Sequence, residues 1–175
     1  TTRLVGSEMC IRDRIKIRYA LIPYLYSEFL KAALNDEMMF RPLAFDFPED
    51  NTAKQAEDQL FLGNELMIAP IYKQNAQGRY VYLPEEMMMI SMKSVSDYTA
   101  AVLPAGHHYV EVPLDTLVFF IRKGKAIPFG AAADNTSQID MSALRLLGYD
   151  GSTYELYSDN GYSPEPEDSL KITTL

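Results

Sequence analysis

The chain has 175 residues, of which 47% are hydrophobic and 23% charged, a composition typical of a globular protein that can bury a core. Its formal net charge of −8 argues against nucleic acid or an anionic membrane surface as a partner, since both are bound by clustered Lys and Arg. The single cysteine, Cys10, excludes a disulfide framework and a cysteine-based zinc site. No apolar run reaches the roughly 18 residues that a membrane-spanning helix requires.

The first fourteen residues, TTRLVGSEMCIRDR, show neither helical nor strand periodicity. The string SEMCIRDR within them resembles a translated sequencing-adapter read-through of the kind found at contig ends. We therefore interpret residues 1–14 as an artefact or a disordered segment outside the fold, with a natural disordered tail as the alternative. The other end, LKITTL at 170–175, is predicted to be a strand with no turn after it, as in a sequence that is cut there.

Residues 15 to about 35 are predicted to form a helix that is largely buried. Pro23 lacks the N–H group that would bond the carbonyl of Tyr19, so we expect a kink or a late helix start there. We expect the helix to end at Asn35-Asp36. The apolar residues that repeat at spacings of four and three, and that we expect to face the core, are Ile15, Tyr19, Ile22, Tyr26, Phe29 and Ala33, widened by Leu21, Tyr24, Leu25 and Leu34.

Residues 41–48, RPLAFDFP, are bracketed by prolines and are predicted to be extended in part, leading into a polar turn. A short helix is expected over residues 52–62, with Asn51 or Thr52 as its cap and Gly63 as its stop. The residues of this helix that we expect to face inward are Ala56, Leu60 and Phe61.

The middle of the chain is typical of a β protein, with runs of strand length separated by Gly and Pro turn signals. In RYVYLP at 79–84 the alternation places Tyr80 and Tyr82 on one face, and Val81 and Leu83 on the other. The spacing of the turns predicts a small antiparallel sandwich or barrel. The predicted strands are 66–72, 79–84, 107–113, 116–121 and 125–129.

A stretch of small and polar residues at 130–137 is interpreted as a linker. Beyond it, residues 144–149 and 153–158 are predicted to be strands that an Asp150-Gly151 turn joins into a hairpin. Pro164-Glu165-Pro166 is expected to form a loop before the last strand. We expect this tail to begin a second β unit, and the fold class to be mainly β with an N-terminal helix.

Few side chains indicate a catalytic or metal site by themselves. His107 and His108 are adjacent on a predicted strand and would point to opposite faces, so they would not share one small site. Glycoside hydrolysis requires two carboxyls that flank one bond, which makes clustered acidic residues candidates for that role. We interpret these residues as turn, cap or ion-pair residues instead. They are Asp46, Glu49, Asp50, Glu57 and Asp58.

The run Met87–Ile90 is interpreted as a buried strand rather than as an adaptable binding surface. The twelve tyrosines could stack on sugar rings, but their distribution over alternating strands favours packing. The sequence contains no Gly-rich phosphate loop, nucleophile elbow or basic–aromatic patch. It therefore predicts no catalytic, cofactor-binding or metal-binding residue, and no cofactor.

Six segments are informative because of their order and spacing: RYALIPYLYSEF (18–29), MFRPLAFDFPED (39–50), DQLFLGNELMIAPI (58–71), VYLPEE (81–86), VPLDTLVFFIRKGKAIP (112–128) and YELYSDNGYS (154–163). Together they resemble the C-terminal part of glycoside hydrolase family 31, which contains the α-glucosidases and α-xylosidases. The resemblance covers nearly all of residues 15–175. The segment from MMMISMK to HHYVEV is most similar to bacterial intracellular-type members, which implies a cytoplasmic location and leaves secretion open.

The resemblance implies an architecture for the chain. Residues 15–65 would be the C-terminal end of a (β/α)8 catalytic barrel, with 15–35 as its last helix and 36–65 as the exit from it. Residues 66–129 would be the proximal C-terminal β-sandwich, and 138–175 the truncated start of the distal one. A whole barrel requires about 250 residues, so most of its strands would lie outside this chain.

The resemblance also implies a retaining mechanism on α-linked oligosaccharides, with one aspartate as nucleophile and another as acid/base, roughly 5 Å apart. Both family motifs lie upstream of the last barrel helix, and neither a Trp-x-Asp-Met-x-Glu string nor a Gly-Asp-Asn string occurs here. We therefore expect the full-length parent to be the enzyme and this chain alone to be inactive. Arg41 in RPL matches a family position, for which we expect a structural role at the barrel–sandwich junction.

Many members of the family place a tryptophan pair after the YLP strand, whereas this chain has no tryptophan. Its preference between glucose and xylose therefore stays open. Two other functions are alternatives, a non-catalytic carbohydrate-binding β module and a structural assembly module. The first predicts exposed aromatic platforms on one sheet face, and the second a large apolar patch without sugar affinity. Homo-oligomers are a further alternative, because a barrel helix without its barrel exposes an apolar face.

Overall fold

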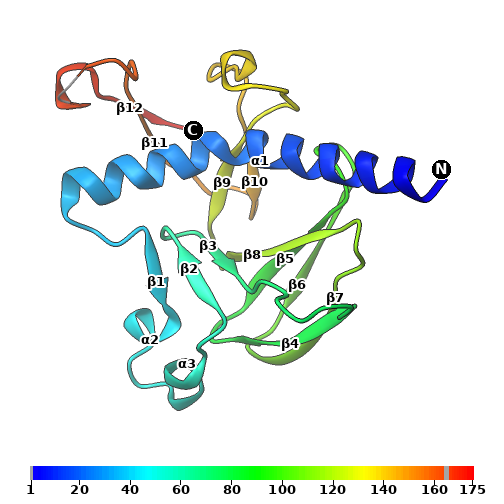
Figure 1. Ribbon diagram of the computed structural model, residues 1–175. Helices are drawn as coiled ribbons and strands as arrows, with labels where there is room; N and C mark the ends of the chain where they lie inside the picture. Colours follow the sequence, from blue (N-terminus) through cyan, green and yellow to red (C-terminus); the bar gives the residue numbers. More distant parts are fainter. Residues whose placement is uncertain (1, 164–165) are drawn as a thin grey trace.

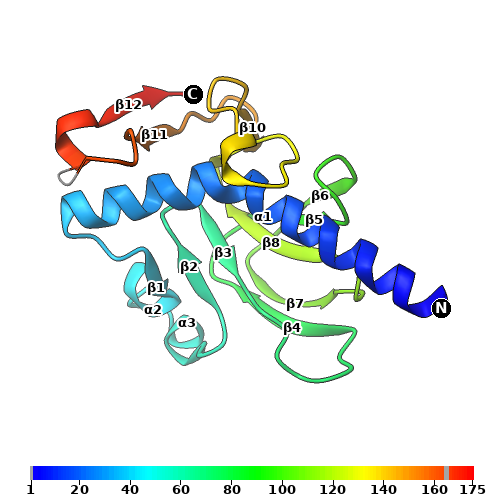
Figure 2. The same ribbon diagram turned by 45° about the horizontal axis from the view of Figure 1, so that its top comes forward.

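The computed structural model of the protein describes residues 2–163 and 166–175. The fold is mainly β, with one long N-terminal helix followed by antiparallel strands, as the sequence predicts. Helix α1 (Thr2–Asn35) has the large sheet on one side and strands β11 (Glu155–Ser158) and β12 (Lys171–Thr174) on the other (Figures 1 and 2). None of the helices in these residues has the combined length and apolar character needed to cross a membrane.

Helix α1 begins earlier than the sequence predicts. Its backbone is helical from Thr2 onward, so the interpretation of residues 1–14 as a disordered segment is wrong for the part that the structure describes. A helix that has already nucleated extends at little cost in free energy, which explains why a segment without apolar periodicity continues it. The helix also continues through Pro23 instead of starting after it, and it ends at Asn35 as expected. The artefactual origin of the segment stays a prediction.

The face of α1 that packs against the sheet matches the predicted one only in part. Ile15 and Phe29, which were predicted to face the core, keep 47% and 55% of their surface exposed. Tyr24 is buried as predicted, together with Ile17 and Ala20, which were not predicted. The prediction failed because α1 carries apolar residues around most of its circumference, so periodicity alone does not say which side is covered. One apolar stripe of the helix is packed against the β-rich part, and a second stripe is left partly exposed.

Two short helices lie where the sequence predicts an extended run at 41–48 and one longer helix after it. The second of them is capped by Asp50 rather than by the predicted Asn51 or Thr52. The Asp50 carboxylate accepts hydrogen bonds from the backbone N–H groups of Thr52 and Ala53. The elements of this region are β1 (Phe40–Pro42), α2 (Leu43–Asp46) and α3 (Asn51–Gln55).

Strand β2 (Leu60–Leu62) takes the place of the predicted helix end. It pairs with β1 on one side and with β3 (Leu66–Ile68) on the other. These long-range ladders override the local helical spacing of the apolar residues. Gly63 therefore does not stop a helix but lies in the β2–β3 turn, where its φ of 68° falls in the left-handed region that favours glycine.

The largest sheet has six antiparallel strands in the order β1-β2-β3-β8-β5-β6, and β4 and β7 form a separate two-stranded ribbon. Strands β4, β7, β8 and β9 begin within one residue of predicted strands, whereas β6 was not predicted. The Met-rich run forms β5, which confirms its interpretation as a strand. The bounds are β4 (Gly78–Leu83), β5 (Met87–Met92), β6 (Tyr98–Leu103), β7 (Gly106–Glu111), β8 (Leu117–Arg122) and β9 (Ala126–Phe129).

The six-stranded sheet is covered on both faces, and successive residues of β8 alternate between two cores. Phe119 and Ile121 pack with Ile17 and Tyr24 of α1. Phe120, between them in sequence, packs in the second core, which lies between the sheet and the β4–β7 ribbon. The sheet thus holds the helix and the ribbon on opposite faces.

The C-terminal strands do not pair as predicted. Asp150 and Gly151 form a turn, with Gly151 at a φ of 76°, but the strands on either side of it pair with different partners. Strand β10 (Arg145–Gly148) pairs with β9, and β11 pairs with β12, so the predicted hairpin is wrong. The Asp-Gly signal specifies a turn, while the choice of ladder depends on residues distant in sequence.

The tail after residue 130 packs on the rest of the chain. Strand β10 extends the ladder of β9, and Tyr154 of the segment before β11 contacts Tyr24 of α1, with ring centroids 5.7 Å apart. The division into domains at 66–129 and 138–175 stays a prediction. The expected loop at Pro164-Glu165-Pro166 includes residues 164 and 165, which lie outside the described residues. Two short 3-10 helices complete the tail, η1 (Thr136–Gln138) and η2 (Pro166–Ser169).

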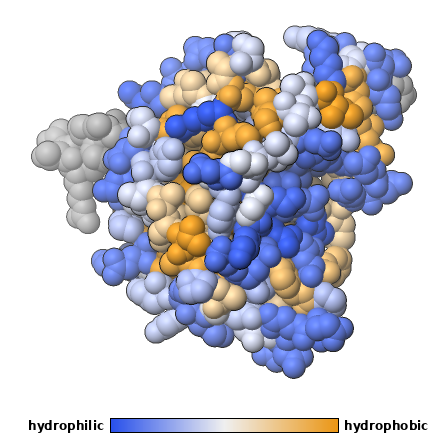
Figure 3. Space-filling model, turned by 180° about the vertical axis from the view of Figure 1, so that it is seen from behind, coloured by the Kyte–Doolittle hydropathy of each residue, from blue (hydrophilic) through white to orange (hydrophobic). Residues whose placement is uncertain are grey.

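Seen from behind, hydrophobic side chains reach the surface in several separate patches among hydrophilic ones (Figure 3). This face therefore does not carry the one large apolar area that a purely structural assembly module predicts.

Candidate functional site

An ion network centred on Asp46 joins α2 to the six-stranded sheet. The Asp46 carboxylate accepts hydrogen bonds from Arg41 (Nε to Oδ1, 3.0 Å) and from Arg122 of β8 (Nη1 to Oδ2, 2.5 Å). Arg122 also donates from Nε to Glu85 (2.6 Å), and Arg41 donates from Nη2 to Asn64 (2.8 Å). The side chains of Arg41, Asp46 and Arg122 are all less than one-fifth exposed.

The network shifts the titration of its central carboxyl. Burial by itself raises the pKa of Asp46, but the hydrogen bonds and positive charges of Arg41 and Arg122 outweigh burial, so the pKa is lowered. The Arg122 guanidinium also lies 4.6 Å from the centre of the Phe61 ring, in the range of a cation–π contact. Asp46 is thus held ionised between two cations, which suits a structural link better than proton transfer.

A second polar cluster joins α1 to the β-rich part. The Tyr24 hydroxyl donates to the backbone oxygen of Leu62 (2.5 Å), and the Tyr154 hydroxyl donates to Glu28 Oε1 (2.6 Å). Lys31 pairs with the same Glu28 oxygen at 2.8 Å. Because every one of these side chains is largely buried, the helix is held by hydrogen bonds as well as by apolar contact.

Burial governs the titration of this cluster. It raises the pKa of Glu65, with a further contribution from the negative charge of Glu28. Burial also raises the pKa of Tyr24 and of Tyr154. The carboxyls of Glu28 and Glu65 lie among tyrosine hydroxyls inside the protein, where a sugar ring has no room to reach them, so they form a helix-docking contact rather than a catalytic pair.

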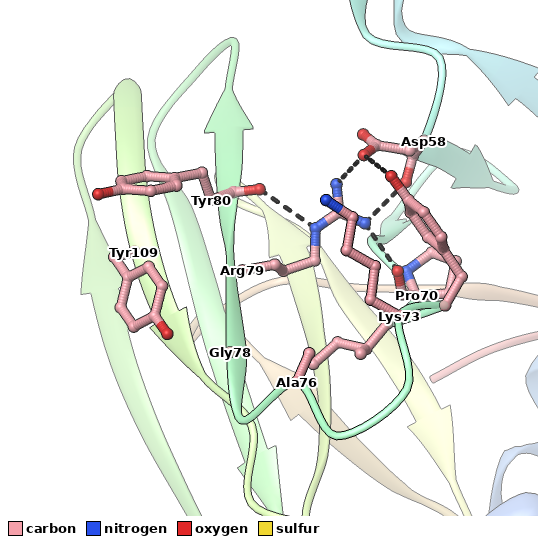
Figure 4. Close-up of a pocket in the computed structure, with 10 residues that line it drawn as sticks. Asp58, Pro70, Lys73, Ala76, Gly78, Arg79, Tyr80 and Tyr109 are labelled. Carbon is pink, nitrogen blue, oxygen red and sulfur yellow. Dashed lines mark hydrogen bonds and ion pairs between the residues drawn. The ribbon is translucent and has the colours of Figure 1, made fainter.

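The third feature is a pocket of about 330 Å³ at the edge of strand β4 (Figure 4). One wall is formed by Arg79, whose guanidinium pairs with Asp58 Oδ2 (2.5 Å) and donates to the Pro70 carbonyl (2.7 Å). Tyr80 and Tyr109 lie on the opposite side of the strand from the Arg79 side chain (Figure 4). The remaining lining residues are Ile71, Tyr72, Lys73, Ala76 and Gly78.

A second pocket, of about 560 Å³, lies between β6 and β10 and is lined by Tyr98, Leu146 and Tyr149 among others. The Tyr149 hydroxyl is the one buried side-chain polar atom without a hydrogen-bond partner among the described residues. Asp150 is the one charged side chain among the lining residues, beside the tyrosines Tyr98 and Tyr149, so the pocket offers few groups for orienting a ligand.

The two histidines point to opposite faces of β7, as predicted. The His107 ring lies 4.9 Å from the ring of Tyr82, and His108 contacts the backbone oxygen of Pro104 through Nε2 (2.8 Å). In the part of the chain that the structure describes, no three His, Cys, Asp or Glu residues are placed to hold a metal ion.

The acidic residues that were candidates for catalysis do not converge on one site. Asp46 belongs to the ion network, Asp50 caps α3 and accepts a hydrogen bond from the Tyr82 hydroxyl, and Asp58 pairs with Arg79. Sequence reasoning missed Arg122 as a partner of Asp46 and missed Tyr109 as a neighbour of Tyr80. Alternation along the predicted strand at 107–113 was a usable signal for Tyr109, since it places Tyr109 on the same face as His107.

The comparisons with known proteins agree with this architecture. The family model described as "Glycosyl hydrolase family 31 C-terminal domain" matches residues 36–127. Alpha-glucosidase 2 of Bacillus thermoamyloliquefaciens is 31% identical over 171 residues, and the alpha-xylosidase of Saccharolobus solfataricus is 30% identical over 156. These alignments cover 94% and 87% of this chain but 21% of each relative, so the chain spans about a fifth of their length.

The solved structure of the GH31 dextranase of Flavobacterium johnsoniae, which was complexed with isomaltotriose, superposes with a TM-score of 0.72 at 26% identity. The superposition covers 91% of this chain and 20% of the dextranase. The GH31 alpha-xylosidase of Xanthomonas citri gives the same TM-score and identity, with 91% and 17% covered. Since the family model matches more than half of the residues, and relatives and folds agree with it, this chain belongs to glycosyl hydrolase family 31.

Proposed function

We propose that this chain is the C-terminal β part of a retaining α-glycosidase that removes terminal α-linked glucosyl or xylosyl residues from oligosaccharides. The names of the relatives, α-glucosidases and an α-xylosidase, support this class of substrate. The two catalytic aspartates belong to a part of the parent polypeptide outside these 175 residues. Residues 66–129 form its proximal β-sandwich, and residues 138–175 start the distal one.

The observation that carries the proposal is the second apolar stripe of α1. On the packed side Ile17, Ala20 and Tyr24 are buried, while Ile15 and Phe29 on the other side are about half exposed. A helix with apolar residues on two sides is typical of an element buried between two layers. We infer that α1 is the last helix of the catalytic barrel, and that the rest of the barrel covers its exposed stripe.

The role of the β-rich part follows from its contacts. The Asp46 network and the Tyr24–Glu28 cluster fasten the short helices and α1 to the sheet through charged and hydrogen-bonded groups. In the parent, this arrangement braces the end of the barrel and fixes the direction in which α1 leaves it. Arg41 contributes as a structural residue of that junction.

This chain by itself is expected to show no hydrolysis of an aryl α-glucoside, because no described pair of carboxyls flanks an open site. The full-length polypeptide of the same gene is expected to release the aryl alcohol, with retention of configuration in the first sugar product seen by NMR. Turnover by the 175-residue chain that disappears in Asp46→Ala would contradict the proposal. A full-length protein without activity on α-glucosides and α-xylosides would contradict it as well.

The exposed stripe of α1 is expected to make the isolated chain self-associate. Replacing Ile15 and Phe29 by Glu should shift the sedimentation profile toward the monomer, with association weakened roughly tenfold or more per apolar side chain removed. Leu114→Glu is the matched control, because Leu114 is 84% exposed but lies in the β7–β8 loop. If the unsubstituted 175-residue chain is monomeric at high concentration, the role assigned to the stripe is contradicted. An effect of Leu114→Glu equal to that of the α1 substitutions would contradict it as well.

A further inference from the structure

The outer face of the β4–β7 ribbon carries four rings in two cross-strand pairs. Tyr80 is directly opposite Tyr109, and Tyr82 is directly opposite His107. Tyr80 and Tyr109 are 72% and 57% exposed, His107 is exposed, and Tyr82 is half-buried. Val81, Leu83 and Val110, which alternate with them, lie in the core. We call these four rings the tyrosine strip.

The rings of the tyrosine strip are held in place before any ligand arrives. The Tyr80 and Tyr109 rings meet edge to face, with centroids 5.2 Å apart and planes at 68°. Tyr109 lies across Gly78, where a Cβ would stand 2.9 Å from its hydroxyl oxygen. The Tyr82 hydroxyl is fixed by Asp50. Rings ordered in this way lose little conformational entropy when they bind a partner.

Of the charged groups that line the pocket beside the strip, Arg79 and Asp58 form an ion pair, whereas Lys73 makes none among the described residues. Arg79 is paired with Asp58 and is covered by the ring of Tyr72, whose centre lies 5.9 Å from the guanidinium carbon. The pocket of about 330 Å³ runs from these residues round the edge of β4 to Tyr80 and Tyr109 (Figure 4). A ligand with many hydroxyl groups suits this combination, because exposed rings stand beside polar groups that can donate and accept hydrogen bonds.

We propose that the tyrosine strip and its pocket bind an α-linked gluco-oligosaccharide. A sugar ring has an apolar face of C–H groups and a rim of hydroxyls, which complements the apolar body and polar tip of tyrosine. The α-linkage rests on the proposed function, since a domain attached to an α-glycosidase meets that class of chain at high local concentration. The pocket gives one end of the sugar chain a place beside Arg79 and Asp58.

The position of the strip is compatible with this role. The ribbon and α1 lie on opposite faces of the six-stranded sheet (Figures 1 and 2). The outer face of β4 and β7 therefore points away from the exposed stripe of α1. A sugar chain held there would be retained by the full-length enzyme.

Calorimetric titration of this 175-residue chain tests the proposal, with isomaltotriose and maltotriose as probes and cellotriose as the β-linked control. At least one α-linked probe is expected to bind, and Tyr80→Ala and Tyr109→Ala should each weaken binding about tenfold. Tyr80→Phe should retain most of the affinity, because the ring remains. Tyr162→Ala is the matched control, since Tyr162 is 94% exposed and lies in the β11–β12 connection. Thermal unfolding checks that each variant is folded.

The proposal is overturned if neither α-linked probe binds at millimolar concentration, or if cellotriose binds equally well. It is also overturned if Tyr80→Ala and Tyr109→Ala bind the probes as tightly as the unsubstituted chain. Self-association that is abolished by Tyr80→Ala would identify the strip as a protein interface and overturn it as well. These outcomes are independent of hydrolysis by the full-length polypeptide, so a failure here leaves the α-glycosidase assignment intact. Conversely, a full-length protein that is active only on other linkages would remove the reason for an α-linked ligand.

Discussion

Replacing Gly63 by alanine is expected to destabilise the protein by about 3 kcal/mol. Two effects add. The φ of 68° at this turn is costly for a residue with a side chain, and the new Cβ would overlap the Glu28 carboxylate and stand 2.5 Å from the Tyr24 hydroxyl. Both groups belong to the buried cluster that docks α1, so the helix has to move. Urea unfolding followed by circular dichroism measures the loss.

Gly124→Ala is the matched control for this prediction. Gly124 has nearly the same φ, 67°, but a Cβ there meets nothing within 4 Å. Its substitution should therefore cost only the backbone strain, about 1 kcal/mol. Hydrogen exchange in α1 should rise in Gly63→Ala and stay unchanged in Gly124→Ala. Equal losses of stability in the two variants would show that Gly63 does not support the contact between α1 and the β2–β3 turn.

Asp46→Asn is expected to lower the free energy of unfolding by about 2 kcal/mol near neutral pH. The substitution leaves the guanidinium groups of Arg41 and Arg122 with a single carboxylate, that of Glu85. The cost is below that of breaking a fully buried pair, since the Asp46 side chain is 18% exposed. Asp134→Asn is the control. Its side chain is 71% exposed and its contact with Lys16 is 3.9 Å long, so its effect should stay near zero.

The loss of stability in Asp46→Asn, relative to the unsubstituted 175-residue chain, should become smaller in acid. The pKa of Asp46 is lower in the folded protein than in the unfolded chain, so its ion pairs stabilise the fold above the unfolded value of about 4. That stabilisation is lost as the pH falls through the lower, folded pKa. The difference in unfolding free energy between the unsubstituted chain and Asp46→Asn should therefore be constant above about pH 5 and shrink toward acid. A difference that does not change with pH would contradict the ionised state of Asp46.

Local patterns predicted the β4 strand well, and the reason is physical. Val81 and Leu83 alternate with Tyr80 and Tyr82, and one face of the ribbon is buried while the other is open, so a period of two is enough to assign both faces. For helix α1, local patterns did not assign the buried face correctly. Its residues are apolar on more than one side, and only the tertiary contacts decide which side is covered.

The contacts that build the candidate sites were beyond local patterns. Arg122 lies 76 residues from Asp46 in sequence, and the Tyr154 hydroxyl bonds to a glutamate 126 residues away. In the tyrosine strip, alternation along each strand assigns the faces of Tyr80 and Tyr109, but it does not predict that the two residues are paired. Strands β4 and β7 are separated by β5 and β6, so no turn signal fixes their register.

Strand β6 ends the six-stranded sheet on the side away from β1 and pairs only with β5 in the described part of the chain. Its sequence, YTAAVL, has no charge, and Val102 is 52% exposed. Natural sheets protect such edges with lysine, proline or a bulge. Here the outer backbone groups of β6 have no strand partner among the described residues, so they are available to a strand of another chain. The sheet edge is thus a second route to association, beside the exposed stripe of α1.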